Sequence, residues 1–148
     1  MNKAEEALRS FSGNFNCAQS VFSVFAPELG LEREMALKIA TSFGGGIAHL
    51  DELCGAMTGA LMVIGLKHGM VKDEDIEAKE KTYALSQEFA ARFKSRHGSL
   101  RCTELIGYNL SNLEDYEKAK EADVFNSCCT KFVKDSVEIL EELLELKK

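Results

Sequence analysis

Apolar residues recur along most of the chain at intervals of three and four positions, the spacing that places them on one face of an α-helix. No stretch alternates apolar and polar residues as a half-buried β-strand would, and the one proline is Pro27. This pattern predicts helices over residues 4–11, 15–25, 31–43, 51–68, 73–97, 101–106, 113–122 and 127–146. We therefore expect an all-α fold, a single-domain helical bundle of about six to eight helices with short loops, spanning residues 1–148.

The apolar stripes of these helices are expected to face the core, as stripes with helical spacing usually do. Met35, Ile39 and Phe43 lie in line along the third predicted helix. The last predicted helix carries a longer stripe, made of Cys129, Val133, Val137, Leu140 and Leu144. Its end, 141-EELLELKK-148, favours a solvated helix end, with the seam of a homodimer as the alternative.

The charge balance excludes two classes of partner. The chain has 18 Lys and Arg against 24 Asp and Glu, which gives a net charge of -6 at pH 7. Nucleic acids and anionic membranes are bound by basic faces, so neither is an expected partner. The uncharged run 53–66 would make a helix of about 21 Å, too short for a hydrocarbon layer of about 30 Å. The start, 1-MNKAEEALRS-10, lacks the apolar segment of a secretory signal, and we expect a cytoplasmic protein.

Four of the five cysteines share a local pattern. Three positions before each of them stands a residue of the N-cap type, whose side chain accepts a hydrogen bond from the start of a helix. The pairs are Asn14 and Cys17, Asp51 and Cys54, Ser99 and Cys102, and Asn126 and Cys129. The pattern predicts that each cysteine occupies the third position of its helix, and it selects Cys129 over its neighbour Cys128.

A thiol in the first turn of a helix has distinctive chemistry. Unpaired N–H groups and the positive end of the helix dipole stabilise the thiolate, so the thiol pKa falls and metal affinity rises. Four such thiolates brought together would suit zinc or an iron–sulfur cluster, and two pairs would suit dithiol–disulfide exchange. Free cysteines also pack as small apolar side chains, so an inert core role is the third interpretation.

Two glycines follow Cys54, one helical turn apart. Gly55 and Gly59, with Ala56 and Ala60, leave one side of the predicted helix thin, so a cofactor or another helix can approach closely. Each glycine costs about 1 kcal/mol inside a helix, and a close approach would offset that cost. We predict Gly55 and Gly59 as cofactor-binding positions, with ordinary helix–helix packing as the alternative.

His49 is the one histidine that we keep as a reserve ligand or base. It follows three consecutive glycines, 44-GGG-46, that predict a loop, and it precedes Cys54 closely. His68 and His97 stand near predicted helix ends, where a cationic side chain interacts favourably with the helix dipole. The sequence has no phosphate loop, nucleotide fingerprint, Ser/His/Asp arrangement or HExxH motif, so enzyme activity is left undecided.

The cysteines and their neighbours resemble the C_GCAxxG_C_C family, whose members are regarded as redox-active. The resemblance runs through 16-NCAQSVF-22, 43-FGGG-46, 54-CGAMTGALMVIGL-66, 101-RCTELIG-107 and 129-CTKFVKDSVEILEELL-144. The central motif departs from the label, since Cys54, Gly55 and Ala56 stand where the label reads Gly-Cys-Ala. Alignment of the last segment gives the family position to Cys129 and leaves Cys128 as an addition. The resemblance implies cysteine-based redox or metal chemistry and supplies no substrate.

Three functions follow from these observations. The one that we favour is a redox-active protein that binds an iron–sulfur cluster or zinc, for electron transfer or metal handling, through Cys17, Cys54, Cys102 and Cys129. The second is a thiol–disulfide redox protein that uses the same cysteines. Both require an electron-transfer or thiol redox partner. The third is a structural or interaction module with core cysteines.

Overall fold

Helices make up most of the chain, and short loops connect them. In the computed structural model, which describes residues 1–146, the helices are α1 (Lys3–Ser12), α2 (Cys17–Phe25), α3 (Arg33–Ala40), α4 (Gly45–His49), α5 (Gly55–His68), α6 (Ile76–His97), α7 (Cys102–Ile106), α8 (Leu113–Glu121) and α9 (Thr130–Leu144). The shorter elements are two 3-10 turns, Pro27–Leu29 and Thr41–Phe43, and a π-helical turn, Phe125–Cys129. No β-strand forms within residues 1–146, where an isolated antiparallel bridge joins Leu53 to Arg101.

Residues at the helix termini explain where several of these helices begin and end. Asn2, Asp75 and Asn112 each accept a hydrogen bond from a backbone N–H in the first turn of α1, α6 and α8 respectively. Such caps contribute about 1 kcal/mol each. α6 and α7 end at Gly98 and Gly107, whose φ values of 88° and 81° favour glycine.

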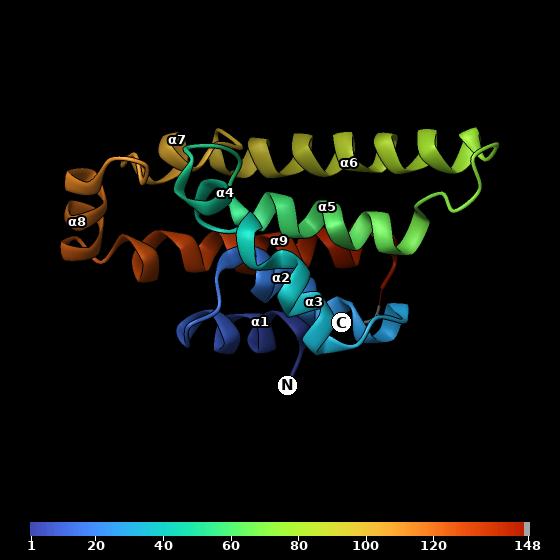
Figure 1. Ribbon diagram of the computed structural model, residues 1–148, viewed down its shortest axis with the longest axis horizontal. Coiled ribbons are helices and arrows are strands. Elements are labelled where there is room, and N and C mark those ends of the chain that lie inside the picture. The colour runs from blue at the N-terminus through green and yellow to red at the C-terminus, as the bar shows by residue number, and fades with distance from the viewer. Residues whose placement is uncertain (147–148) are drawn as a thin grey trace.

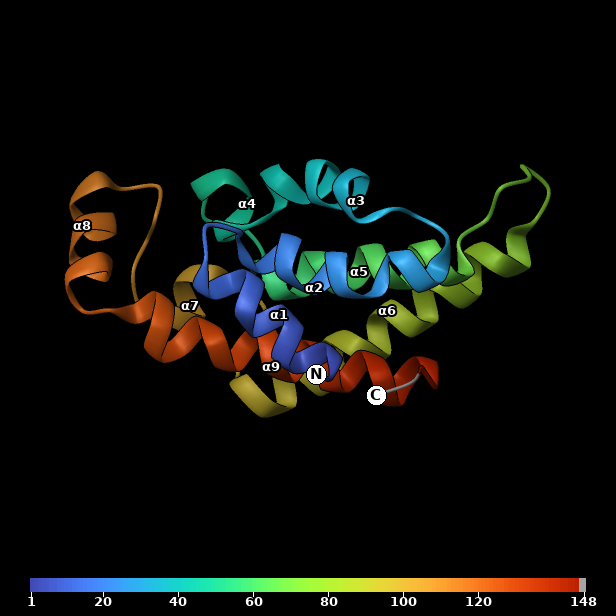
Figure 2. The ribbon, with the colours of Figure 1, turned by 90° about the horizontal axis from the view of Figure 1, so that it is seen from below.

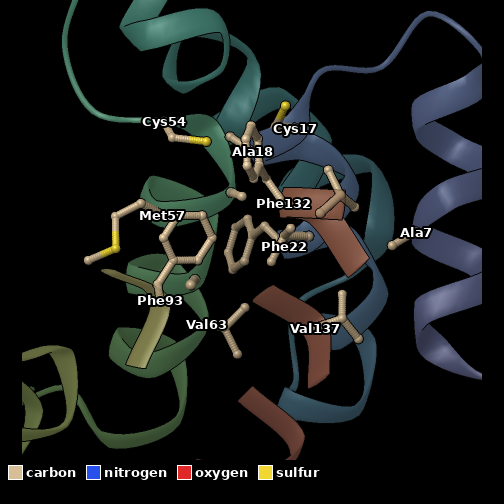
Figure 3. Packing of buried hydrophobic residues seen from close by; sticks show 14 of the residues in the cluster. Ala7, Cys17, Ala18, Phe22, Cys54, Met57, Val63, Phe93, Phe132 and Val137 are labelled. Atoms are coloured by element: carbon tan, nitrogen blue, oxygen red, sulfur yellow. The ribbon is translucent and has the colours of Figure 1, made fainter. Parts of the chain in front are cut away.

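The helices pack into a bundle around one apolar core (Figure 1). α5 lies between α2 and α6, and α9 contacts α1, α5 and α6. The largest fully buried side chains include Phe25, Ile64, Phe89, Phe93 and Leu140. Burial of a side chain of this size stabilises the fold by about 1.5–3 kcal/mol. Figure 3 shows part of this core, with Cys17 and Cys54 at one end of it.

The beginnings of α2, α5 and α7 and the turn that leads into α9 gather at one end of the bundle, the end at which α8 lies (Figures 1 and 2). Four of the cysteines stand at these beginnings. The direction in which the four helices run therefore brings distant parts of the sequence to one end of the molecule.

The prediction of an all-α bundle with short loops is confirmed. α4 is a left-handed turn, and without it the described chain contains eight α-helices. The stripe of α9 is buried as predicted, whereas several predicted helices start a few residues too early. Within residues 1–146, every helix is too short or too polar to cross a membrane.

The core prediction for the third helix is wrong. The side chains of Met35, Ile39 and Phe43 are exposed by 42%, 47% and 38%. The helix instead buries Ala36 and Ala40 and packs against α2. Alanines let two helix backbones approach closely, and this close contact leaves the larger apolar side chains on the solvent side.

Candidate functional site

Four of the five cysteines line one cavity of about 560 Å³. They are Cys17, Cys54, Cys102 and Cys129, and each is a buried free thiol. Cys128 is half-buried and lies outside the cavity wall. The structure thus brings together the four cysteines that the sequence pattern selects. Their role as metal ligands stays a prediction.

Cys17 is the first residue of α2, and a capping box holds this helix start in place. The Asn16 side chain accepts from the Gln19 N–H at 2.9 Å, and the Gln19 side chain accepts from the Asn16 N–H at 3.0 Å. The Gln19 amide also donates to Leu37 O at 3.0 Å and to Thr41 Oγ1 at 3.1 Å. The start of α2 is therefore anchored to the end of α3.

Two backbone hydrogen bonds pair Cys54 with Cys102. The Cys54 N–H donates to Leu100 O at 2.8 Å, and the Cys102 N–H donates to Glu52 O at 3.0 Å. These bonds belong to the antiparallel bridge between the segments that precede α5 and α7. Because the cysteines supply the donors themselves, the bridge holds their backbones side by side.

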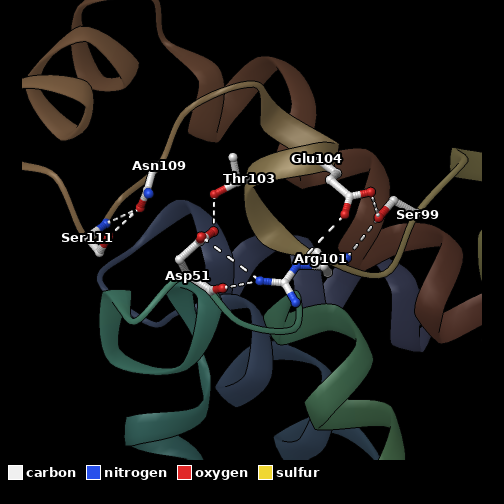
Figure 4. Close-up of polar contacts among 7 residues, drawn as sticks. All are labelled: Asp51, Ser99, Arg101, Thr103, Glu104, Asn109 and Ser111. Carbon is white, nitrogen blue, oxygen red and sulfur yellow. Dashed lines mark hydrogen bonds and ion pairs between the residues drawn. The ribbon is translucent and has the colours of Figure 1, made fainter.

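Asp51 ties the same two segments together through further contacts (Figure 4). Thr103 Oγ1 donates to the Asp51 carboxylate, and the Arg101 guanidinium donates to the Asp51 carbonyl oxygen. Ser99 Oγ accepts from the Arg101 N–H at 3.1 Å and donates to the Glu104 carboxylate at 3.0 Å. The loops that carry Cys54 and Cys102 are thus fixed on both sides of the bridge.

The π-helical turn Phe125–Cys129 places Cys129 in the cavity wall. A π-turn adds one residue relative to an α-helix, and such turns often occur at functional sites. Cys128 points elsewhere, packing against the core beside Ser127, with 3.8 Å between Ser127 Oγ and Cys128 Sγ. The preference for Cys129 over Cys128 at the site is therefore matched by the geometry.

The N-caps predicted from the sequence are wrong in register at all four cysteines. α2 and α7 begin at Cys17 and Cys102 themselves. α5 begins one residue after Cys54, and Asn126 lies inside the π-helical turn. A short polar side chain can bond to a group in a nearby loop instead of capping a helix. Asp51 does this by accepting a hydrogen bond from Thr103.

The segment Gly45–His49, labelled α4, is a left-handed turn beside the thiols. Its φ values are 62°, 73°, 60°, 52° and 61°. The left-handed conformation costs about 1–2 kcal/mol for each residue that is not glycine, and the last three residues are Ile47, Ala48 and His49. The loop predicted at residues 44–46 is therefore the start of a strained turn, which the Glu52 N–H secures by donating to Gly46 O at 2.9 Å.

Glycines make room for two of the thiols. A Cβ on Gly55 would lie 2.8 Å from Cys17 Cβ. A Cβ on Gly46 would lie 3.0 Å from Cys102 Cβ and 3.5 Å from its Sγ. A side chain at either position would push a thiol away, so both glycines shape the cavity wall.

The two glycines of the predicted cofactor contact have different surroundings. Gly55 lines the cavity directly after Cys54. Gly59 lies where α5 meets α2, and a Cβ there would approach Ala18 O at 2.8 Å. Gly59 thus allows close packing of two helices, and the cofactor contacts predicted at Gly55 and Gly59 stay predictions.

Burial sets the acidity of most of the cavity thiols. It raises the pKa of Cys54 to about 12 and that of Cys102 to about 12. A hydrogen bond between Cys17 and Cys129 raises the pKa of Cys17 and lowers the pKa of Cys129. The expectation that helix dipoles lower all four pKa values is therefore wrong for three of them, because burial and neighbouring thiols outweigh the dipole. Cys129 is the cavity thiol that ionises first.

Aromatic side chains form the outer part of the cavity. The His49 ring lies 5.0 Å from the Tyr116 ring, which lies 6.1 Å from the Phe125 ring. All three residues line the cavity. Sequence reasoning kept His49 but missed Tyr116 and Phe125, since single aromatic residues in polar segments give no signal of a site. His97 is elsewhere, with its Nε2 2.9 Å from an Asp135 carboxylate oxygen.

The four thiols affect one another's pKa, and Cys129 acts on each of the other three. Cys17 and Cys129 share a hydrogen bond, and Cys54 and Cys102 share the backbone bridge. Over the described residues 1–146, no three His, Cys, Asp or Glu side chains are grouped so as to hold a single metal ion. The geometry is therefore that of four interacting thiols in the wall of one cavity.

Comparison with known proteins gives the family. A protein-family model described as "Putative redox-active protein (C_GCAxxG_C_C)" matches residues 15–143, nearly the whole chain. The chain belongs to this family. The resemblance inferred from the cysteine segments is thereby confirmed, and the C_GCAxxG_C_C description agrees with a redox role that involves a redox partner. No curated protein and no solved structure matches the chain.

Proposed function

We propose that this C_GCAxxG_C_C protein transfers single electrons by means of a two-iron iron–sulfur cluster held by the four cavity cysteines. The observation that carries the proposal is that these thiols come from four separate segments and line one cavity. Among the described residues of the cavity wall there is no Asp, Glu, Lys or Arg. Iron–sulfur clusters are held by cysteine thiolates, commonly four, so the donor set fits.

The spread of the thiols favours two irons over one zinc ion. Each iron of a two-iron cluster takes two protein ligands, so the four cysteines of the cavity wall supply the ligands of one cluster. A structural zinc site needs four ligands around one centre, with Zn–S bonds of about 2.3 Å. No three donors within residues 1–146 meet in that way. We therefore place an iron–sulfur cluster ahead of zinc.

Electrostatics in the cavity also supports a bound cation. Besides its hydrogen bond to Cys129 and its burial, Cys17 has its pKa raised by negative charge on the other three thiols. Four buried thiolates without a counter-charge would lose hydration and repel one another. A bound cluster supplies the missing positive charge together with a one-electron redox couple. Binding is then expected to release the thiol protons.

The chain contributes the environment of such a site. The backbone N–H groups of Ala56 and Met57, at the start of α5, act to lower the pKa of Cys54 and so favour its thiolate, although burial outweighs them. The bridge between the segments before α5 and α7 keeps Cys54 beside Cys102. Hydrogen bonds to sulfur and exclusion of water are the means by which a protein sets the reduction potential of this kind of centre.

Protein purified without oxygen and without an affinity metal tests the proposal. We expect about two iron atoms and two inorganic sulfides per chain, with broad visible absorption that bleaches on reduction. Metal-free protein with all five thiols titratable would contradict the proposal. Colourless protein with stoichiometric zinc would contradict it too, and would reassign the thiols to a structural site or to metal handling.

Thiol–disulfide exchange is the second candidate, and the hydrogen bond between Cys17 and Cys129 favours it. The Cys129 thiolate would attack a partner disulfide and release one partner thiol. The Cys17 thiolate would then attack the mixed disulfide at Cys129 and release the second partner thiol. The two cysteines lose two electrons to the partner and close a disulfide.

A thiol count tests this second candidate. Under mildly oxidising conditions the metal-free protein would lose two of its five titratable thiols and regain them on reduction. The Cys17→Ser variant should instead accumulate the mixed disulfide at Cys129, since the resolving thiol is missing. A count that does not change on oxidation would reject thiol–disulfide exchange.

A further inference from the structure

The cavity that contains the four thiols is larger than a sulfur site requires. Its volume is about 560 Å³. Pockets for small organic molecules measure about 300–1,000 Å³, so this volume lies within their range. The few inorganic atoms of a two-iron cluster would occupy a small part of it, close to the cysteines. Space for a second molecule remains beside them.

The wall of the cavity selects against anions. None of its described residues is Asp, Glu, Lys or Arg. An anion that entered would lose its hydration and would meet no Lys or Arg side chain, which is unfavourable. The polar groups of the wall are three asparagine amides, the hydroxyls of Ser12 and Tyr116 and the imidazole of His49, with Asn14 exposed at its edge. An occupant that fits this wall is neutral and carries a carbonyl or hydroxyl group.

The wall also selects for a flat molecule. Six aromatic or imidazole rings line it, from Phe11, Phe15, His49, Tyr116, Phe125 and Phe132. The three outer rings form a series, with centroid distances of 5.0 Å from His49 to Tyr116 and 6.1 Å from Tyr116 to Phe125. Rings in this distance range offer stacked and edge-to-face contacts to a further ring.

We propose that the cavity binds a neutral, planar aromatic carbonyl compound, a quinone of about naphthalene size, between the aromatic rings and the four thiols. The inference rests on the proposed function, because a quinone beside the cysteine site would be its electron partner. Binding itself depends on the shape, neutrality and aromatic lining of the wall. Quinone binding can therefore be measured separately from the iron and sulfide content.

Equilibrium dialysis of the anaerobically purified protein against 2,3-dimethyl-1,4-naphthoquinone tests the proposal, with quinone and hydroquinone counted together. Methyl groups on both quinone ring carbons prevent addition of a thiol to the probe. We expect a dissociation constant in the micromolar range. Naphthalene-2-sulfonate, which adds a charge, and 2-decalone, which is neutral but not planar, should bind roughly tenfold more weakly or worse. Absence of binding, or equal binding of 2-decalone, would overturn the proposal.

Variants locate the binding. Phe125→Ala removes a ring from the wall, and Phe125→Leu removes the ring but keeps a larger apolar side chain than alanine. Both variants should weaken binding by roughly three- to tenfold, the effect of losing one aromatic pair. Tyr83→Ala is the matched control, since Tyr83 is 58% exposed on α6 and lies outside the cavity wall. Unchanged affinity in both Phe125 variants would place the probe elsewhere and reject the proposal.

Iron and sulfide contents of the same preparations separate this inference from the proposed function. Protein that carries a cluster and fails to bind the quinone rejects the inference alone. Protein that binds the quinone without any cluster supports the inference and rejects the two-iron site.

Discussion

The four cavity thiols differ in how readily they ionise. Burial keeps Cys54 and Cys102 protonated, whereas the hydrogen bond from Cys17 favours the thiolate of Cys129. Thiol reactivity follows the thiolate fraction. The identity of the four residues can be predicted from the sequence, but their acidity cannot, because each pKa depends on burial and on sulfur neighbours that only the fold supplies.

Alkylation rates test this order. In metal-free, reduced protein with Cys128→Ser, we expect iodoacetamide to label Cys129 first near neutral pH, as read by peptide mass mapping. Cys17→Ala removes the hydrogen-bond donor, so the pKa of Cys129 should rise and labelling of Cys129 should slow. Labelling of Cys54 ahead of Cys129, or an unchanged rate in Cys17→Ala, would contradict the order.

The raised pKa values also predict how stability depends on pH. Cys54 and Cys102 ionise near 9.0 when unfolded and near 12 when folded, so the unfolded chain gives up their protons first. Their contribution to stability is complete below pH 9.0 and is lost as the pH rises from 9.0 towards 12. Urea unfolding of the metal-free protein at a series of pH values measures the loss. In a variant with Ala at both positions, the free energy of unfolding should fall less steeply with pH than in the parent protein. Equal slopes in the two proteins would contradict the burial of the two thiols.

At the level of elements, periodicity predicts most of the helices but not their first turns. The residue at which a helix starts depends on which of several competing local hydrogen bonds forms. At Asp51, hydrogen bonds with Thr103 and Arg101 form in place of the predicted helix cap. Periodicity also cannot tell which face of an amphipathic helix meets its neighbour. In α3 the contact with α2 buries the alanines and exposes the larger side chains.

The first turn of α5 should tolerate no side chain at Gly55. Gly55→Ala would set a Cβ 2.8 Å from Cys17 Cβ, so we expect lower stability and loss of iron from the purified protein. Gly65→Ala is the control in the same helix, because nothing lies within 4 Å of its Cβ. It should stabilise the protein by about 1 kcal/mol in urea unfolding. Equal effects of the two substitutions would contradict the close approach of α5 to Cys17.

The left-handed turn predicts that Ala→Gly stabilises the protein within the turn and destabilises it within a right-handed helix. Ala48 is exposed with φ 52°, so Ala48→Gly should relieve strain and stabilise the protein by about 1 kcal/mol. Ala91 is exposed in the right-handed helix α6, where Ala91→Gly should destabilise by about 1 kcal/mol. Thermal or urea unfolding measures both variants. Destabilisation by Ala48→Gly would contradict the left-handed conformation.

At the level of the whole molecule, the convergence of the thiols is a property of topology. The cysteines lie on four segments whose starts meet at the end of the bundle where α8 lies (Figure 2). The sequence suggests a common role for these cysteines through their shared spacing, yet it carries no information on helix direction. The aromatic wall could not be predicted for the same reason, since Phe11, Tyr116 and Phe125 come from separate elements.

The central claim is that four cysteines form one redox site and the fifth does not. The most direct test is the iron and inorganic sulfide content of the anaerobically purified protein and of its five single Cys→Ser variants. The account predicts about two of each per chain in the parent protein and in Cys128→Ser. The iron and sulfide content should fall sharply in the variants at Cys17, Cys54, Cys102 and Cys129, while circular dichroism still shows a helical fold. Iron-free parent protein, or iron that is lost equally in Cys128→Ser, would contradict the account.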